Sequence, residues 1–424
     1  MQAKLKSIMQ PSGLSRRNAL KALAIGSAVL AAPSLKATEN IANCQLTYDK
    51  AINYLGLHQA GVLTPEQKCA SFIAFNVTSN TVEELQTIFS LLTKRIAYLT
   101  QPQQAPATKN DKMPPAESGI LGTHLQPDSL TITVALGAPL FDHRFGLEKL
   151  KPQHLSEMTS FPNDRLEQKW CGGDILLQIC ANSQESVIYA LRDILRHISA
   201  YCFPLWKIDG FLPARDIDNH TTPINLFGFK DGTGNAATND SALMNDLIWV
   251  TPDSKEPSWC DGGTYQAVRL IRFNLEFWDR TPLEDQENDF GRHKDSGAPI
   301  GMKNEHDDPA FEKDPHGDRV LFDSHMRRAE PRNPERHTAK LRRRSYSYSL
   351  GLTDAGALDM GLIFVSYQRN LKTGFIDTQK RLNGEPLERY IKPFGGGYYF
   401  VLPGVESTKE ILGEKMFFAL KQAN

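Results

Sequence analysis

Apolar residues fall into short runs that predict strands and into longer stretches at helical spacing that predict helices. Residues 70–77 form a run typical of a strand, and residues 81–99 then carry apolar side chains three and four positions apart, as one face of a helix does. Thr81, followed three positions later by Glu84, is the pair that caps a helix start. Residues 130–136 alternate in polarity and predict a second strand.

The same plan recurs later in the chain. Residues 174–181 predict a strand, and a helix with apolar positions on one face follows at residues 187–195. Residues 265–275 predict a strand before a polar helical stretch, and residues 360–367 predict one before a helix. Two halves with the order strand, helix, strand, strand, helix, strand indicate a duplicated ferredoxin-like unit of the α+β class, with helices on one face of an antiparallel sheet.

The boundary between the halves is predicted near residues 213–225. This gives an N-terminal ferredoxin-like domain at residues 38–215 and a C-terminal one at residues 216–424. Ligand sites favour such junctions. Residues 281–336 are a long polar region with little periodicity, and a loop of that length is usually functional or disordered. Candidate chemistry is therefore expected in these two regions.

Residues 1–37 differ from the rest of the chain because they hold six bases and no acid. Arg16 and Arg17 precede the apolar residues 22–32, a run shorter than the roughly 20 residues that span a bilayer. The segment is similar to a twin-arginine export signal, which directs folded proteins to the periplasm. Export in the folded state would let a cofactor be inserted beforehand. No later run is long enough to predict a transmembrane segment.

Charge and cysteine content exclude several classes of function. Without the bases of residues 1–37, 42 bases face 49 acids, and this charge of −7 makes a nucleic-acid binder a poor candidate. The six cysteines include no C-x-x-C pair, which argues against zinc and iron–sulfur sites. We expect mostly buried, small apolar residues at Cys44, Cys69, Cys171, Cys180, Cys202 and Cys260.

Residues 228–235, Gly-Phe-Lys-Asp-Gly-Thr-Gly-Asn, place one acid among three glycines behind the apolar residues 224–229. A carboxylate there sits on a backbone that is free to turn sharply and to approach a ligand closely. Taken alone, the octet is ordinary turn chemistry. A functional interpretation depends on the residues that accompany it further along the chain.

A second candidate lies in the long polar region. His325 is predicted in the first turn of a short helix that Asp323 or Ser324 could cap and that Pro331 and Pro334 would end. Taken alone, it is one of several histidines in a polar loop, with His293, His306 and His316 nearby.

Three motifs in a fixed order carry a resemblance to a known family. They are the Asp231 turn, G-x-x-D-G; the segment that begins at His325, H-x-R-x-A-x-P-R; and Arg343, eighteen positions after the histidine. By these three motifs the chain resembles the haem-dependent dye-decolourising peroxidases. The resemblance covers nearly the whole mature chain. The export signal and residues 382–385 and 395–398 are similar to the exported deferrochelatase/peroxidase branch, associated with bacterial iron uptake. The resemblance implies the duplicated ferredoxin-like fold of the dimeric α+β barrel superfamily, and a homodimer.

The resemblance also implies one haem b per chain, with His325 as the axial ligand of the iron. It assigns Asp231 to move a proton between the two oxygens of peroxide, and Arg343 to stabilise the departing charge. Arg332 is suited to a haem propionate. The implied haem contacts are Gly232, Thr233 and Gly234 on one face and Glu330, Pro331 and Arg332 on the other, together with His325 and Arg343.

Several side chains keep more than one interpretation. The carboxylate that accepts a hydrogen bond from His325 is expected at Glu388, with Asp323 as the alternative. Arg342 and Arg344 are expected to be solvated or paired on the surface. Four aromatic side chains could relay electrons from bulky donors, although packing is the simpler interpretation: Trp259, Trp278, Tyr346 and Tyr348.

The sequence therefore predicts a periplasmic haem b peroxidase that reduces hydrogen peroxide and oxidises organic donors. It would be linked to iron acquisition from haem and to components of an iron-uptake system. One alternative is a deferrochelatase that releases iron and leaves the porphyrin intact, with Glu305, His306 and Asp307 leading metal outward. Another is a periplasmic haem carrier without chemistry of its own.

Overall fold

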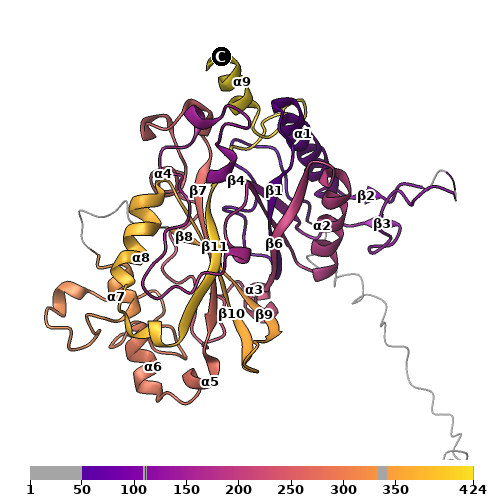
Figure 1. The fold of residues 1–424 in the computed structure, drawn as a ribbon. Helices are drawn as coiled ribbons and strands as arrows, with labels where there is room; N and C mark the ends of the chain where they lie inside the picture. Colours follow the sequence, from indigo (N-terminus) through magenta and orange to yellow (C-terminus); the bar gives the residue numbers. More distant parts are fainter. Residues whose placement is uncertain (1–49, 108–109, 111, 333–340, 424) are drawn as a thin grey trace, which may run out of the picture. The chain divides into compact units, whose positions relative to one another are not determined.

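Helices and strands alternate along residues 50–107, 110, 112–332 and 341–423, which the computed structural model describes (Figure 1). The predicted export segment, Cys44 and Pro334 lie outside these residues. The strands are β1 (Cys69–Val77), β2 (Gln103–Gln104), β3 (His124–Leu125), β4 (Thr131–Gly137), β5 (Ile175–Ala181), β6 (Cys202–Phe211), β7 (Thr264–Phe273), β8 (Arg342–Arg343), β9 (Tyr346–Leu352), β10 (Leu358–Gln368) and β11 (Ile391–Val401). The α-helices are α1 (Val82–Leu99), α2 (Gln184–Ile198), α3 (Ala214–Asp218), α4 (Ser241–Leu247), α5 (Leu275–Trp278), α6 (Leu283–Phe290), α7 (His325–Ala329), α8 (Asp377–Leu382) and α9 (Glu414–Ala423). None of the helices described is long and apolar enough to cross a membrane.

The main sheet closes on itself. Its hydrogen-bonded order is β7-β11-β4-β5-β1-β6-β9-β10-β8, and β10 also pairs with β7, so that a ring of strands is completed. Neighbouring strands are antiparallel. In Figure 1, α1 and α2 lie together on the side of β1 and β6, whereas α7 and α8 lie beside β11. Closure is one way in which antiparallel sheets avoid exposed edges.

Each half of the chain contributes four strands to the ring in the same spatial order, and the short strand β8 pairs with β10 outside this repeat. The order β4-β5-β1-β6 places the second, third, first and fourth strands of the first half side by side, and β9-β10-β7-β11 repeats this order in the second half. The pairs β6–β9 and β4–β11 join the two halves. The duplicated α+β fold with antiparallel strands is therefore confirmed. The domain limits at residues 38–215 and 216–424 remain a prediction.

Strand β1 is apolar at nearly every position because each of its faces packs in a different core. Ile73 and Phe75 belong to the core under α1 and α2, whereas Phe72 and Ala74 belong to the core inside the ring of strands, with Trp206 of β6. Both faces of the strand are buried. A strand buried on both faces needs apolar residues at successive positions rather than at alternate ones.

The first half of the chain folds as its pattern predicts. The Thr81 hydroxyl accepts a hydrogen bond from the Glu84 amide at 3.2 Å, so the predicted cap of α1 is confirmed. Where this half has one long helix after its first strand, the second half has the short helices α5, α6 and α7 with polar loops between them. The long polar region thus replaces a sheet-covering helix, and it carries His325.

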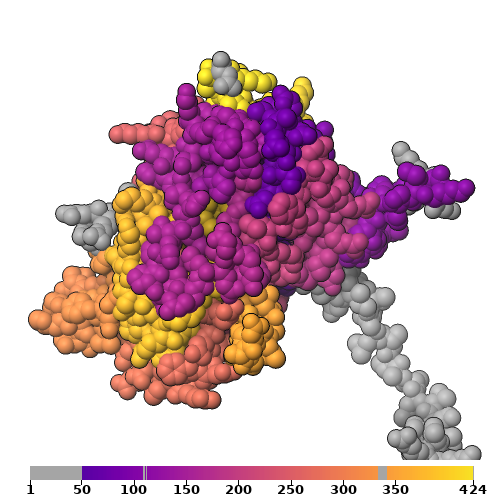
Figure 2. All heavy atoms as spheres, in the orientation of Figure 1, coloured from indigo at the N-terminus to yellow at the C-terminus, as the bar shows by residue number. Residues whose placement is uncertain are grey.

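The connection between β4 and β5 crosses β11. Arg165 N donates to Pro393 O and Glu167 N donates to Phe394 O, both at 2.8 Å. In the space-filling view of Figure 2, this connection covers part of the yellow β11. Because β11 belongs to the second half of the chain, the connection adds a further contact between the halves.

Candidate active site

The turn that carries Asp231 (residues 222–235, the Asp231 turn) is anchored by aromatic packing. Phe227 and Phe229 are buried and stack on aromatic rings of β7 and α6, with ring centroids 3.8 and 4.1 Å apart. Between them Gly228 adopts a φ of +83°, which glycine reaches without strain. The apolar run before the acid therefore fixes the base of the turn.

Asp231 forms an ion pair with Arg343 of β8, with 3.1 Å between Oδ1 and Nη1. Their side chains are 14% and 27% accessible, so the pair is partly accessible and is not sealed in the core. Asn235 holds the arginine backbone: its Nδ2 donates to Arg343 O at 2.8 Å, and its Oδ1 accepts from Arg343 N at 2.9 Å. The structure thus joins two predicted residues that are far apart in sequence.

Gly232, Thr233 and Gly234 continue the turn beside this pair. Gly232 has a φ of +129°, and a methyl group built on Gly234 would lie 3.8 Å from Arg343 Nη2. The Thr233 hydroxyl donates to Glu305 Oε1 at 2.9 Å. The clearance that these residues would give to a haem remains a prediction.

His325 is the first residue of α7, as predicted. Ser324 occupies the N-cap position, but its hydroxyl donates to Leu321 O at 2.8 Å and makes no capping bond. The helix is held by buried Arg327, whose Nη1 donates to Asp314 Oδ2 at 2.8 Å. The long polar region therefore places His325 on a short helix that the ion pair between Arg327 and Asp314 fixes.

The carboxylate that pairs with His325 is Glu385, so the prediction of Glu388 or Asp323 is wrong. His325 Nδ1 lies 2.7 Å from Glu385 Oε2, and the Glu385 side chain is only 3% accessible. The Glu388 carboxylate instead accepts a hydrogen bond from Gly384 N at 2.9 Å, and Asp323 is exposed. A 3₁₀ turn follows Glu385 and directs the side chain of Glu388 back to its own loop.

Charges act on His325 from two directions. Burial lowers the pKa of the imidazole, but the charge and hydrogen bond of Glu385 outweigh it, so the pKa is raised above its usual value. Arg343 lowers the same pKa and Asp231 raises it, so the three residues share one electrostatic neighbourhood. In the neutral ring, Nδ1 donates to Glu385 and Nε2 keeps its lone pair; Nε2 has no hydrogen-bond partner among the described residues.

Arginines gather near the Asp231–Arg343 pair. The pKa of Arg292 is lowered to about 10, mainly by burial and also by the charges of Arg343 and Arg332, whereas Glu305 and Glu330 oppose this. These residues therefore lie within electrostatic reach of one another. Guanidinium groups are suited to bind the oxygens of an anionic ligand.

The residues present fit haem b. An imidazole nitrogen suits the iron, and guanidinium groups suit the two propionate carboxylates. Arg332 is exposed and pairs with Asp308 at 2.9 Å, and Pro331 beside it is also exposed. The roles of Glu330, Pro331 and Arg332 toward haem remain predictions.

Arg342 and Arg344 are buried, so the prediction of surface side chains is wrong. Arg342 Nη2 donates to Glu66 Oε1 at 2.8 Å; Arg344 Nη1 donates to Thr64 O at 2.5 Å, and its Nη2 to Gln67 Oε1. The reason is that β8 and β9 belong to the closed sheet, so side chains beside Arg343 enter the protein. The four aromatic side chains that could relay electrons are also buried: Trp259, Trp278, Tyr346 and Tyr348.

Sequence reasoning did not assign Asn235, Glu385 or Arg292 to the site. Asn235 closes the glycine-rich octet, and Glu385 closes residues 382–385, so both lie in segments that the motifs had marked. Arg292 lies in the long polar region, where no periodicity or motif distinguishes one charged residue from another.

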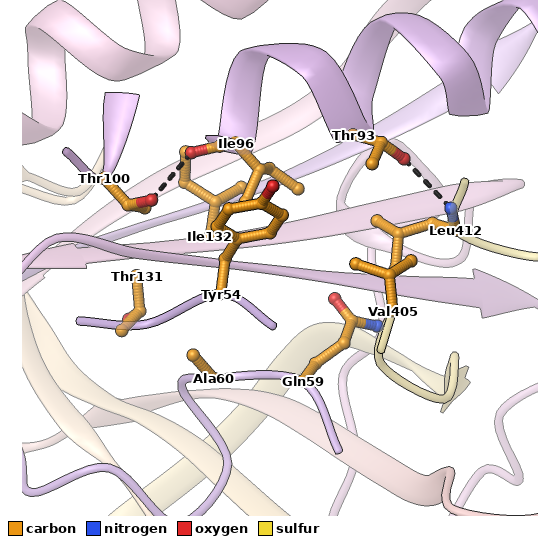
Figure 3. Close-up of a pocket in the computed structure, with 10 residues that line it drawn as sticks. All are labelled: Tyr54, Gln59, Ala60, Thr93, Ile96, Thr100, Thr131, Ile132, Val405 and Leu412. Carbon is orange, nitrogen blue, oxygen red and sulfur yellow. Dashed lines mark hydrogen bonds between the residues drawn. The ribbon is translucent and has the colours of Figure 1, made fainter. Parts of the chain in front are cut away.

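Two pockets lie away from this site. The one in Figure 3, between α1 and β4, measures about 20 Å³, and its Gln59 amide is bonded to Val134 O and Leu402 O. That volume holds about one water molecule. A second pocket of about 240 Å³ is lined by His154, Asp246, Ser254, Glu256, Arg369, Asn370 and Thr373. Neither contains a predicted site residue.

Comparison with known sequences finds one family along both halves of the chain. Residues 59–212 match the N-terminal model of the Dyp-type peroxidases, and residues 222–406 match the C-terminal model. A deferrochelatase of Escherichia coli O157:H7 is 52% identical over 365 residues, 86% of each chain. A deferrochelatase of Shigella flexneri is 51% identical over 365 residues, 86% of this chain and 87% of the relative.

Solved structures agree with the sequence comparison. A DyP-type peroxidase from Cellulomonas bogoriensis is 31% identical with a TM-score of 0.77, covering 87% of this chain and 98% of the other. Ferric DtpA from Streptomyces lividans is 29% identical with a TM-score of 0.77, covering 88% of this chain and 98% of the other. The chain therefore belongs to the Dyp-type peroxidase family and is a haem-dependent enzyme, with haem b as its cofactor.

Proposed function

We propose that this chain is an exported haem b peroxidase that reduces hydrogen peroxide and oxidises organic donors in the periplasm. The observation that carries the proposal is the partly accessible Asp231–Arg343 pair, which shares an electrostatic neighbourhood with His325. A proton carrier, a fixed cation and a metal-binding imidazole are the groups that peroxide cleavage needs.

His325 would hold the haem iron through Nε2. Its Nδ1 donates to the buried Glu385, which fixes the ring orientation and increases the basicity of the imidazole. The haem contacts would come from Gly232, Thr233, Gly234, Glu330, Pro331 and Arg332. When bound, the haem supplies an iron centre that takes two oxidising equivalents from peroxide and passes them to donors one at a time.

Asp231 would move the proton that peroxide cleavage requires. One carboxylate oxygen accepts the proton from the first peroxide oxygen and returns it to the second, which leaves as water. Arg343 remains cationic and stabilises negative charge on the departing oxygen. The 3.1 Å ion pair keeps the two side chains together, and Asn235 fixes the backbone of the arginine.

The test compares Asp231→Asn and Arg343→Ala with wild type after loading with haem. Each change should slow the reaction with hydrogen peroxide at least about tenfold, since such groups contribute on the order of 10²-fold. Stopped-flow absorbance measures the rate, and Glu312→Gln, an exposed acid of the same polar region, is the control. If neither variant is slower than the control by that factor, the assignment of these residues is wrong.

A role in iron acquisition is favoured by the name of the relatives, which is deferrochelatase at 52% identity. Such an activity would release iron from haem and leave the porphyrin intact. The predicted outlet at residues 305–307 is not supported, because the Glu305 carboxylate is occupied by Lys230 and two threonines, and no metal-binding group of three His, Cys, Asp or Glu occurs among the described residues. Incubation with haem under reducing, peroxide-free conditions tests for this activity. Fluorescence of metal-free porphyrin would support iron release, and its absence would contradict it.

Export and assembly complete the proposal. The predicted twin-arginine segment at residues 1–37 would carry the folded, haem-loaded chain to the periplasm, where components of an iron-uptake system are the expected partners. We propose a homodimer there, by the resemblance to the family. Cell fractionation with Arg16→Lys and Arg17→Lys together, and sedimentation of the purified protein, test the two statements; cytoplasmic retention and a dimer are the expected results.

A further inference from the structure

The Asp231 turn is interlocked with residues 291–306 of the long polar region. Gly297 has a φ of +72°, and a methyl group built there would approach Lys230 Cδ to 2.7 Å. Gly228 has a φ of +83°, and a methyl group there would approach Lys294 Cε to 2.6 Å. Each segment therefore offers a glycine at the point where a lysine of the other segment passes.

Glu305 is the one described acid that bonds to both flanks of Asp231. Its Oε2 accepts a hydrogen bond from Lys230 Nζ at 2.5 Å. Its Oε1 accepts one from the Thr233 hydroxyl at 2.9 Å and another from the Thr222 hydroxyl. The carboxylate is only 14% accessible, so these three donors replace most of its hydration.

The backbone of Glu305 is fixed as well. Arg292 Nη1 donates to Glu305 O at 3.0 Å and to Gly297 O at 2.7 Å. Arg292 therefore fixes the backbone of Glu305, and the Glu305 carboxylate binds the Asp231 turn. Glu305 holds Asp231 indirectly, through Lys230 and Thr233 on either side of it, while the Asp231 carboxylate bonds to Arg343.

We propose that Glu305 is a positioning residue for the reaction: it holds the Asp231 turn so that the Asp231 carboxylate stays beside Arg343. The inference rests on the proposed function of Asp231 and adds a residue to it. General acid–base catalysis depends on placing a carboxylate within hydrogen-bond reach of the proton it moves, and small displacements are costly in rate. Glu305 acts through the turn and touches no reacting atom.

Glu305→Gln tests this with little change in size. The amide of glutamine can accept from the threonines only by turning its NH₂ group toward the Lys230 ammonium, where donor faces donor. Lys230→Met is the second variant, because it removes the same bond from the opposite side and keeps the stem that passes Gly297. Glu312→Gln is the matched control, an exposed acid seven positions along the same region.

Two measurements separate positioning from general damage. In the haem-free protein, Glu305→Gln and Lys230→Met should increase hydrogen exchange of the amides of residues 222–235, while the control stays at the wild-type rate. In the haem-loaded protein, Glu305→Gln should slow the peroxide reaction about tenfold. In an Asp231→Asn background it should slow the reaction by less than about twofold, because effects through a shared group are not additive.

The outcomes distinguish this inference from the function on which it rests. If Asp231→Asn alone leaves the peroxide rate unchanged, the role of Asp231 fails, and that of Glu305 fails with it. If Asp231→Asn is slow but the Glu305 and Lys230 variants match the control in exchange and in rate, only the positioning role fails. Equal slowing by Glu305→Gln in both backgrounds would also contradict it, because the effect would then not pass through Asp231.

Discussion

The pair of His325 and Glu385 shows what single residues contribute to the site and what the sequence leaves open. The sequence around His325 was sufficient to predict that this histidine lies in the first turn of a short helix. Its carboxylate partner was not predictable, because Glu385 and Glu388 lie three positions apart in a short irregular segment. Only the turn that follows Glu385 decides which of the two side chains meets α7.

Glu385→Gln is expected to weaken haem retention about 10- to 100-fold, because the glutamine keeps a hydrogen bond to His325 but removes the charge that makes the imidazole basic. The rate of haem transfer to excess apomyoglobin measures retention. Glu388→Gln is the control and should transfer haem at the wild-type rate. Equal rates for all three proteins would contradict the role of Glu385.

Glu305 gives a prediction about pH. Burial raises the pKa of its carboxyl group, but hydrogen bonds from Lys230, Thr222 and Thr233 outweigh burial and lower it. A carboxyl group whose pKa is lower in the folded state stabilises the fold above its unfolded pKa of about 4.3, and this stabilisation is lost as the pH falls through the folded pKa.

The free energy of unfolding of haem-free wild type should therefore exceed that of Glu305→Gln by a constant amount between about pH 8 and pH 5, and the difference should shrink below about pH 4. His306 lies 3.9 Å from the same carboxylate but is largely exposed, so its charge should contribute little. Urea titrations at each pH measure the difference. A difference that grows toward low pH would contradict the bonding of Glu305.

At the scale of elements, strands were predictable and the long polar region was not. Residues 70–77, 174–181 and 360–367 carry apolar patterns that packing in a closed sheet demands; the first and third ranges lie within β1 and β10, and the second matches β5 except at its first residue. The region at residues 281–336 has no such pattern, since its segments are held by ion pairs and glycine contacts. Those contacts depend on which distant side chains meet, and local periodicity does not record that.

Gly396 of β11 gives a prediction at this scale. It has a φ of +121°, and a methyl group there would collide with the backbone carbonyl of Val268 in β7. Because a strand backbone cannot give way as a side chain can, Gly396→Ala should lose at least about 3 kcal/mol of unfolding free energy. Gly356→Ala is the control: its φ is also positive, but open space surrounds it, so about 1 kcal/mol is expected. Urea unfolding measures both, and equal losses would contradict the close approach of β11 to β7.

For the whole molecule, the duplicated order of elements was predictable from the sequence, and the strand pairs that join the two halves were not. The repeated order of strands and helices is visible in the pattern, whereas the closing pairs β6–β9 and β4–β11 join residues that no local signal connects. A buried ion pair strengthens this union: Asp164, in the connection after β4, bonds to Arg269 of β7, with side chains 1% and 2% accessible. The domain limits near residue 215 remain a prediction.

Asp164→Asn should therefore cost about 3–5 kcal/mol of unfolding free energy, because it leaves the Arg269 charge buried without its partner. Asp377→Asn, which breaks the exposed pair with Lys372, should cost less than about 1 kcal/mol. Urea unfolding followed by circular dichroism measures both. Similar small losses for the two variants would show that the buried pair does not join the halves.

We propose that His325 would hold the haem iron, and one absorbance experiment tests this most directly. Haem is titrated into wild type, His325→Ala and the control His316→Ala, an exposed histidine of the same region, and one equivalent of hydrogen peroxide follows. Wild type and His316→Ala should show a Soret band that saturates at one haem per chain and changes on adding peroxide, and His325→Ala should not. A wild-type protein without a Soret band, or a His325→Ala spectrum identical to that of wild type at every step, would contradict the account.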